Sequence, residues 1–576
     1  MRMILVPGYR NLFGEPEKNY YEYVKDIPSE IVIATMIALN NELNVNLSEK
    51  ENQERLRGLI SARFNKEQLK LLNIATEKYR RKTKGLFKGY FFGSRYLLSM
   101  VLKELNNYRS FKITDDSPQQ EFNMLMAYFL LIDEVNDAGN VVFAEGKGKF
   151  NEPLGHYRLI WTTTIDQYEL NEKPNVGFEF FKLLCFVGYA ITTFRAESKE
   201  YVNQLGFKSY GELLYSIHQV TMTTVIQNTN TSFQKLNYIR PLDGVDEKHL
   251  QSQAINGLIG KREIVYGDLK KHSLYYNHHE KFMVIDEDIY RKRTYKGPFF
   301  DLFYSTHLRE RMKFNQYSDN ISSTVLEKKL FRSILTGLRN NKYNILFFND
   351  ESDSAPDCYY RQGKNIFLIE FKAYLFPDEI SSNPNFEKIK GYIDKRFVSN
   401  EKGQAKGIGQ VIKQMKLLYE NNFGFDKTFK EELYKKKVTI YPIICHTEFY
   451  FSLPGINEYL NDIFLQEVPA ELKEKFVIKP LTVIDLANLC DMALRGSNFR
   501  QLESFIDRYH RVLENRKKHA SKFIDIDLFM KSRSSFDEMY DHPFQSDLPN
   551  EPNNTTLLDK LYNLMDIKQE HWDEVL

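Results

Sequence analysis

The chain has 576 residues, of which 42% are hydrophobic and 27% charged, enough for about two to four globular domains. Its 79 Lys and Arg residues nearly balance 77 Asp and Glu residues, and the net charge of +2 excludes binding to nucleic acid through bulk charge alone. Four widely spaced cysteines without a CxxC pair indicate neither a disulfide framework nor a zinc knuckle, which favours a reducing cytoplasm.

The start of the chain carries no pattern typical of export. Its apolar run ends at Pro7 and Gly8, too early for a secretory signal. The longest apolar segment, LLCFVGYAITTF at residues 183–194, is shorter than the roughly 18 to 20 residues that span a bilayer, and we expect a buried helix there. We therefore expect a cytoplasmic protein with no membrane partner.

Residues 28–285 show apolar side chains recurring three and four positions apart, the pattern of amphipathic helices. The clearest stretches are DIPSEIVIATMIALNNEL, QERLRGLISARFNKEQLKLLNIATEKYRR, SRYLLSMVLKELNNY, QQEFNMLMAYFLLIDEVNDA and SYGELLYSIHQVTMTTVIQ. No fixed repeat indicates a solenoid. We predict a mainly helical region at residues 1–315 that acts as a sensor, a substrate clamp or an oligomerisation platform.

Beyond residue 315 the pattern changes to alternating helices and strands. STVLEKKLFRSILTGLRNN predicts a helix, and three strands are expected in YNILFFND, APDCYY and NIFLIEFKAY. A polar insertion that we expect to be mobile, LFPDEISSNPNFEKIKGYIDKRFVSNEKGQ, precedes a helix in AKGIGQVIKQMKLLYENN and a doubly covered strand in KKVTIYPIICHTEF. A further strand and helix extend this part to residue 535, and residues 536–576 are expected to form a flexible acidic tail with a short helix.

Two charged residues interrupt the apolar strand NIFLIEFKAY. Because successive side chains of a strand alternate between its faces, Glu370 and Lys372 share one face. Burying an unpaired charge costs free energy, so the presence of these two charges in an apolar strand needs a structural or functional explanation. The same E-x-K triplet begins at Glu145, Glu327 and Glu471, but only Glu370 and Lys372 lie within an apolar strand pattern.

Pro356-Asp357, twelve intervening residues and then Glu370-Phe371-Lys372 resemble the signature of the PD-(D/E)xK nuclease superfamily. The predicted order of helix, strand, strand, strand, helix and strand is similar to its core, over about residues 320–455. The resemblance implies a multidomain α+β and α/β protein. In it, the helical region precedes a nuclease domain at residues 316–535 with a restriction-endonuclease-like αβββαβ core and a mixed central sheet.

The chemistry of these residues agrees with the resemblance. Asp357 and Glu370 on adjacent strands would form a cradle for Mg²⁺, a hard cation that binds one or two carboxylates and keeps several waters, with Mn²⁺ as the expected substitute. The ion would polarise the scissile phosphate and activate an attacking water, and Lys372 would orient that water or neutralise developing charge. We therefore predict hydrolysis of phosphodiester bonds in DNA, with RNA as the second choice.

The resemblance also implies roles outside the strand. Glu327 matches an additional acid on the helix before the first strand, and a surface glutamate is the alternative interpretation. Gln410 matches a glutamine on the helix after the catalytic strand in some branches, which often carry Tyr where this chain has Gln414. Gln414, Lys406 and Lys413 are predicted to contact nucleic acid, with a solvated helix face as the alternative for the lysines.

Two other motifs are weaker. The histidines in KKHSLYYNHHEK fit no standard zinc spacing, and NGLIGKREI lacks the spacing of a phosphate-binding loop, so a separate ATPase or activating partner would supply any NTP hydrolysis. The resemblance implies an effector of a bacterial restriction or anti-phage defence system that forms a homo-oligomer, because cutting two strands needs two sites. Two alternatives stay open: a catalytically silent nuclease-fold module that binds nucleic acid or protein, and a helical sensor whose nuclease is only an output.

Overall fold

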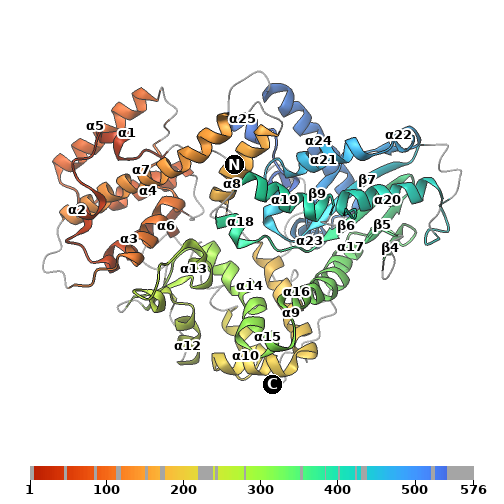
Figure 1. Cartoon of the computed structure of the whole chain (residues 1–576), viewed down its shortest axis with the longest axis horizontal. Helices are drawn as coiled ribbons and strands as arrows, with labels where there is room; N and C mark the ends of the chain where they lie inside the picture. Colours follow the sequence, from red (N-terminus) through yellow and green to blue (C-terminus); the bar gives the residue numbers. More distant parts are fainter. Residues whose placement is uncertain are drawn as a thin grey trace.

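The computed structural model contains two separate sheets surrounded by helices (Figure 1). It describes residues 6–43, 49–83, 87, 89–111, 118–148, 154–168, 175–217, 238–239, 244–277, 281–349, 355–382, 385–399, 403–421, 424–429, 437–520 and 526–540. In Figure 1 the N-terminal helices, in red and orange, lie on one side, and the larger sheet, in green to blue, lies on the other. The predicted mixture of a helical N-terminal region and a later mixed sheet is confirmed.

The first part of the chain forms a group of helices with its own hydrophobic core. These helices are α1 (Tyr9–Phe13), α2 (Tyr20–Val24), α3 (Ser29–Leu43), α4 (Glu49–Ser61), α5 (Lys66–Lys82), α6 (Ser94–Asn106) and α7 (Pro118–Gly148). Asn65 and Gln68 form a capping box at the start of α5. Leu98, Val101 and Leu105 of α6 are buried at the spacing of three and four that predicts a helix.

A small antiparallel sheet, which the helical pattern of residues 28–285 does not predict, packs against these helices. Its strands are β1 (Tyr238–Ile239), β2 (Leu274–Asn277) and β3 (Lys281–Val284), in the order β1-β3-β2, with α12 (Gly244–Ser252), η2 (Ile255–Leu258) and α13 (Tyr266–Lys271) beside them. Asn41 of α3 donates from Nδ2 to the carbonyl oxygen of Val284 at 2.7 Å. Strands of two to four residues are too short to show an alternating pattern.

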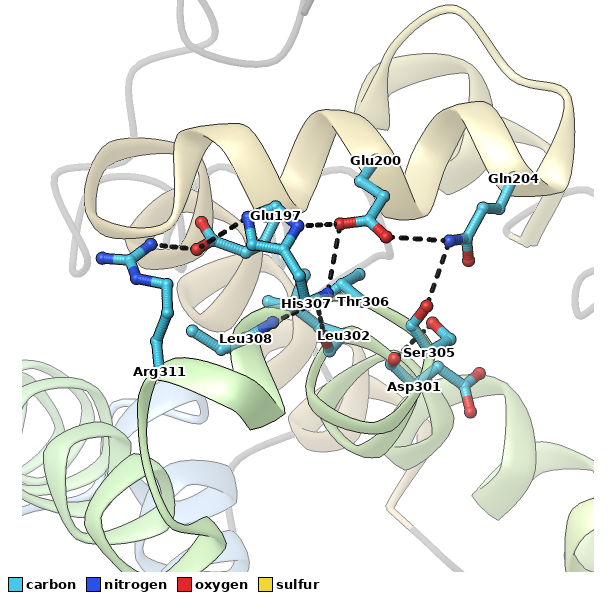
Figure 2. Close-up of polar contacts among 10 residues, drawn as sticks. All are labelled: Glu197, Glu200, Gln204, Asp301, Leu302, Ser305, Thr306, His307, Leu308 and Arg311. Atoms are coloured by element: carbon cyan, nitrogen blue, oxygen red, sulfur yellow. Dashed lines mark hydrogen bonds and ion pairs between the residues drawn. The ribbon is translucent and has the colours of Figure 1, made fainter.

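A second group of helices precedes the larger sheet in the sequence, and most of its members lie in the lower part of Figure 1. It contains α8 (Gly155–Tyr168), α9 (Val176–Thr193), α10 (Arg195–Leu205), α14 (Glu287–Ser305), α15 (Leu308–Arg311) and α16 (Phe314–Ile321). Helix α9 holds most of the apolar segment at residues 183–194 and is buried there, as predicted. Figure 2 shows Glu197, Glu200 and Gln204 of α10 joined to the end of α14 and to α15.

No single helix of the described residues has both the length and the apolar character to cross a membrane. The pair Gly177–Thr193 and Arg195–Leu205 meets that test only when its two helices, which meet at 118°, are taken together. Part of the helix predicted at SYGELLYSIHQVTMTTVIQ is observed, since residues 210–217 are helical. Residues 218–227 lie outside the described residues.

The larger sheet is mixed. Its strands are β4 (Ile345–Phe348), β5 (Cys358–Gln362), β6 (Asn365–Lys372), β7 (Thr439–His446), β8 (Val477–Ile478) and β9 (Thr482–Asp485). They follow the order β4-β5-β6-β7-β8, and β9 also pairs with β7. The first three strands pair antiparallel, and β6, β7, β8 and β9 run parallel. The parallel strands are nearly continuous apolar runs, as expected for a sheet covered on both faces.

Helices cover both faces of this sheet. One face carries Phe367, Ile369 and Phe371 of β6 and packs against η3 (Ser322–Phe331), α17 (Arg332–Gly337), α23 (Leu486–Leu494) and α24 (Phe499–Ala520). The other face carries Ile366 and Leu368 and packs against α19 (Phe386–Phe397), α20 (Gly407–Tyr419), α21 (Ile456–Glu467) and α22 (Ala470–Lys475). The remaining short helices are α18 (Asp378–Ser382), η5 (Phe449–Ser452), α25 (Ile526–Lys531) and α26 (Phe536–Met539).

The segment predicted as a mobile polar insertion contains α18 and α19. Helix α19 begins after Asn385, whose side chain accepts hydrogen bonds from two backbone amides, and buries Ile389 and Ile393 in the core. The prediction missed this helix because its apolar residues are few among many charged ones. Gly407, at φ 21°, lets α20 start against α19, since a Cβ there would lie 2.9 Å from the carbonyl oxygen of Phe397.

Hydrophobic packing crosses the domain boundary predicted at residue 315. Trp161 of α8 is fully buried and stacks on Phe386 of α19 at 5.6 Å between ring centroids. The division at residue 315 stays a prediction. The tail predicted at residues 536–576 differs from the structure at its start, because Phe536 and Tyr540 are buried in the core, and residues 541–576 lie outside the described residues.

Candidate active site

Asp357 stands directly before β5, the strand that pairs with β6. Its Oδ2 accepts a hydrogen bond from the backbone amide of Phe371 at 2.7 Å. The side chain of Asp357 is 23% exposed, so it borders both the sheet and solvent. The β5–β6 hairpin therefore fixes this carboxylate beside the end of β6.

Glu370 and Lys372 lie at the C-terminal end of β6, and both are buried. Lys372 Nζ lies 3.2 Å from Glu370 Oε2 and 3.8 Å from Asp357 Oδ2. Three side chains separated by up to fifteen positions in the sequence thus meet around one ammonium group. The structure therefore brings the three residues together, and their role in holding a metal ion stays a prediction.

The electrostatics of this cluster are unusual for a protein core. The pKa of Glu370 is raised to about 8, first by burial and next by the negative charge of Asp357, while the charge of Lys372 acts against both. Burial acts to lower the pKa of Lys372, but the charges of Glu370 and Asp357 outweigh it, so that the pKa is raised. Lys372 therefore carries its charge while Glu370 resists ionisation. Perturbed carboxyl groups of this kind gather at functional sites.

Glu327 lies on η3, a ten-residue π-helix, and π-helical turns often occur at functional sites. Burial raises the pKa of Glu327, and the charge of Asp357 is the next cause, which places the two carboxylates near each other. Ser322 Oγ at the start of η3 donates to the carbonyl oxygen of Ala373 at 3.3 Å, tying the helix to the end of β6. The structure thus brings Glu327 to the predicted site.

The four residues on or beside α20 that were predicted as site residues differ in their burial and contacts. Gln410 has a buried Oε1 without a hydrogen-bond partner among the described residues. Gln414 is buried, with 6% exposure, and its contact with nucleic acid stays a prediction. Lys406 is the N-cap of α20 and Lys413 is exposed, and in the described part of the chain neither has an ion pair with a residue of the cluster.

The other E-x-K triplets lie on helices. Glu145 is on α7, Glu327 on η3 and Glu471 on α22, so none of them has both charged residues on one face of a strand. The structure supports the choice of Glu370 and Lys372 by their context.

Asp357 and Glu370 fit a hard divalent cation. The pKa of Glu370 is raised first by burial and next by the negative charge of Asp357, and a cation bound between the two carboxylates would act against both effects. Among the described residues no group of three or more His, Cys, Asp or Glu is arranged to hold a metal. Two carboxylates with water and substrate oxygens are nevertheless the usual set for Mg²⁺.

The sequence reasoning missed His446. It pairs with Lys372 in the parallel register between β6 and β7, so that the two side chains stand next to each other on one face. His446 is fully buried, its Nε2 lies 3.7 Å from Asp537 Oδ2, and burial lowers its pKa to about 4. A polar residue ending the apolar run TIYPIICH was the available signal.

The other histidine motif adds no site here. His272 is described, and burial lowers its pKa, whereas His278 and His279 lie outside the described residues.

No family model, no curated protein and no solved structure matches this chain.

Proposed function

We propose that the chain is a Mg²⁺-dependent nuclease of the PD-(D/E)xK type, which hydrolyses phosphodiester bonds of DNA, with RNA as the alternative substrate. The observation that supports it is the meeting of Asp357, Glu370 and Lys372 at the end of a doubly covered strand. The order η3 and α17, β4, β5, β6, α20, β7 is consistent with the same proposal.

Each side chain has a distinct role in this proposal. Asp357 and Glu370 hold the cation, which when bound polarises the phosphate and helps a water to attack phosphorus. The backbone amide of Phe371 orients the carboxylate of Asp357 through its hydrogen bond. Lys372 neutralises negative charge that develops on the phosphate oxygens. Glu327, close to Asp357, accepts the proton that leaves the attacking water.

The test is cleavage of plasmid DNA and of single-stranded RNA by the purified protein with Mg²⁺ or Mn²⁺. We expect nicking or linearisation by the wild-type chain, and a loss of at least about a hundredfold in rate for Lys372→Met, because charge neutralisation at the transition state contributes about that much. Lys473→Met is the matched control. It removes the lysine of another E-x-K triplet, on the exposed surface of α22.

The outcomes separate the candidate functions. Cleavage that Lys372→Met abolishes and Lys473→Met retains supports the nuclease. Retained cleavage by Lys372→Met contradicts the proposed site. Binding of nucleic acid without cleavage under either metal favours the silent binding module. The proposed roles in restriction or anti-phage defence, in a homo-oligomer and with a separate activating partner stay predictions.

A further inference from the structure

Helix α19 brings a guanidinium group beside the end of the catalytic strand. Arg396 Cζ lies 4.3 Å from the ring centroid of Tyr374 and 5.2 Å from that of Tyr392. Tyr374 follows Lys372 by two residues and is close enough to contribute to the raised pKa of its ammonium group. Arg396 therefore stands next to the cluster described above, although it lies in the inserted segment.

The rings of Tyr374 and Tyr392, over which Arg396 lies, are held in place by neighbouring residues. The Tyr392 hydroxyl donates to the carbonyl oxygen of Leu375. Phe376 stacks on Tyr450 with 4.3 Å between centroids. Phe397, the neighbour of Arg396, is fully buried in the core. Phe376 also contacts the ring of Tyr392 at 5.4 Å between centroids, and Phe397 contacts the ring of Tyr374 at 6.5 Å. A guanidinium that lies over these packed rings loses little further freedom when it binds a ligand.

Arg396 differs from the other cations of α19. Lys388 pairs with Glu379 at 3.0 Å, and Lys390 pairs with Asp394. Within the described residues Arg396 forms no ion pair with a carboxylate, and its buried Nε has no hydrogen-bond partner. A buried donor of this kind is costly unless a ligand or water pairs with it.

We infer that Arg396 binds a backbone phosphate of the nucleic acid next to the scissile phosphodiester. A planar guanidinium can donate two parallel hydrogen bonds to a phosphate, which suits it to this role better than an ammonium group. Apart from Lys372, the site presents the carboxyl groups of Asp357, Glu370 and Glu327, which repel a polyanion when they are ionised. The inference rests on the proposed nuclease function, because it assigns the substrate contact of the same site.

The test compares wild type, Arg396→Met and Arg396→Lys, with Lys388→Met as a control that removes one exposed cation from the same helix. Cleavage of a labelled DNA duplex is measured at about 50 and about 200 mM salt. We expect Arg396→Met to raise KM about tenfold with little change in kcat, because a contact made equally in the ground and transition states affects binding alone. Arg396→Lys should retain part of the binding, and Lys388→Met should match wild type.

A second readout keeps the test independent of catalysis. Binding of the same duplex, followed by fluorescence anisotropy with EDTA, should weaken in Arg396→Met, and its dependence on salt should fall by about one released counterion. If wild type cleaves and Arg396→Met matches Lys388→Met, the inference is wrong while the nuclease proposal stands. If nothing cleaves, the nuclease proposal fails and anisotropy decides the role of Arg396. Equal binding by all variants, or none by wild type, overturns the inference.

Discussion

At the scale of residues, two buried charged pairs in the same sheet behave differently. Asp426 accepts hydrogen bonds from Arg361, Thr428 and Tyr359, and these outweigh the effect of burial and lower its pKa. Glu370 accepts one hydrogen bond, from Lys372, and its pKa is raised to about 8. The first pair is fully satisfied and stabilises the fold. The pair of Glu370 and Lys372 keeps an electrostatic free-energy cost that binding of a cation would remove. We therefore assign a functional role to this pair.

The raised pKa of Glu370 predicts how metal binding depends on pH. Below about pH 8 the carboxyl is mostly protonated, so binding a cation must displace one proton. We expect the apparent affinity for Mg²⁺ to rise about tenfold per pH unit between about pH 6 and pH 8, and then to level off. Calorimetric titration with Mg²⁺ alone measures this.

The control for this prediction is Glu370→Gln, which has no proton to displace. Its residual affinity should depend much less on pH. Without metal, a carboxyl with a raised folded pKa gives stability that is present at low pH and lost as pH rises through about 8. Glu370→Gln should therefore be more stable than wild type above that pH in EDTA. A wild-type affinity that stays constant over this range would contradict the pKa.

At the scale of elements, buried charge also fastens helices to each other. Glu197 of α10 is 1% exposed and contacts Arg311 of α15, with His307 Nε2 at 3.5 Å (Figure 2). The backbone amide of His307 donates to Glu200 Oε2 at 3.2 Å, and Gln204 Nε2 donates to the carbonyl oxygen of Ser305 at 3.0 Å. This row of contacts holds α10 against the junction of α14 and α15.

Removing the cation from this row should destabilise the protein. Arg311→Met removes the guanidinium partner of the buried carboxylate of Glu197, and we expect a loss of about 2 kcal/mol in the free energy of unfolding, because an uncompensated buried charge is costly. Denaturant unfolding measures it. The double variant Glu197→Gln with Arg311→Met should recover most of the loss. Arg309→Met, an exposed neighbour, should change little, and an equal loss there would show that the effect is not due to Glu197.

At the scale of the whole molecule, the hydrophobic cores extend across the domain boundary that the sequence predicts at residue 315. The core on one face of the large sheet includes α9, and the core on the other face includes α8, both N-terminal to residue 315. Trp161 contacts Phe386 and Tyr459, with ring centroids 5.6 and 5.3 Å apart. The predicted nuclease domain therefore shares its interior with earlier helices.

This packing predicts which fragments fold. A chain of residues 316–535 exposes the faces that α8 and α9 cover, and we expect it to aggregate or to unfold without a cooperative transition. A chain of residues 154–540 keeps those helices and should unfold cooperatively by circular dichroism. In the full chain, Trp161→Ala should cost about 3 to 5 kcal/mol, since it empties a buried site. Cooperative folding of the shorter fragment would show that residue 315 is a true boundary.

The sequence alone determined the features that depend on local pattern. Alternation in NIFLIEFKAY predicted a strand with Glu370 and Lys372 on one face, and periods of three and four predicted the helices of the N-terminal region. Apart from α18 and α19, the order of elements from η3 to β7 followed from the same patterns, because strands and helices differ in hydrophobic period. Asp357 was found because its distance from Glu370 matched a known signature.

The tertiary structure alone decided the features that depend on distant contacts. Only the hairpin pairing brings Asp357 to the amide of Phe371, and only the parallel register sets His446 beside Lys372. Helix α19, which carries Arg396, is stable because the core buries its few apolar residues. The charged sequence of the helix does not reveal this contribution to stability. Short-range pattern specifies which face a residue takes, whereas the partner across that face depends on chain segments up to hundreds of residues away.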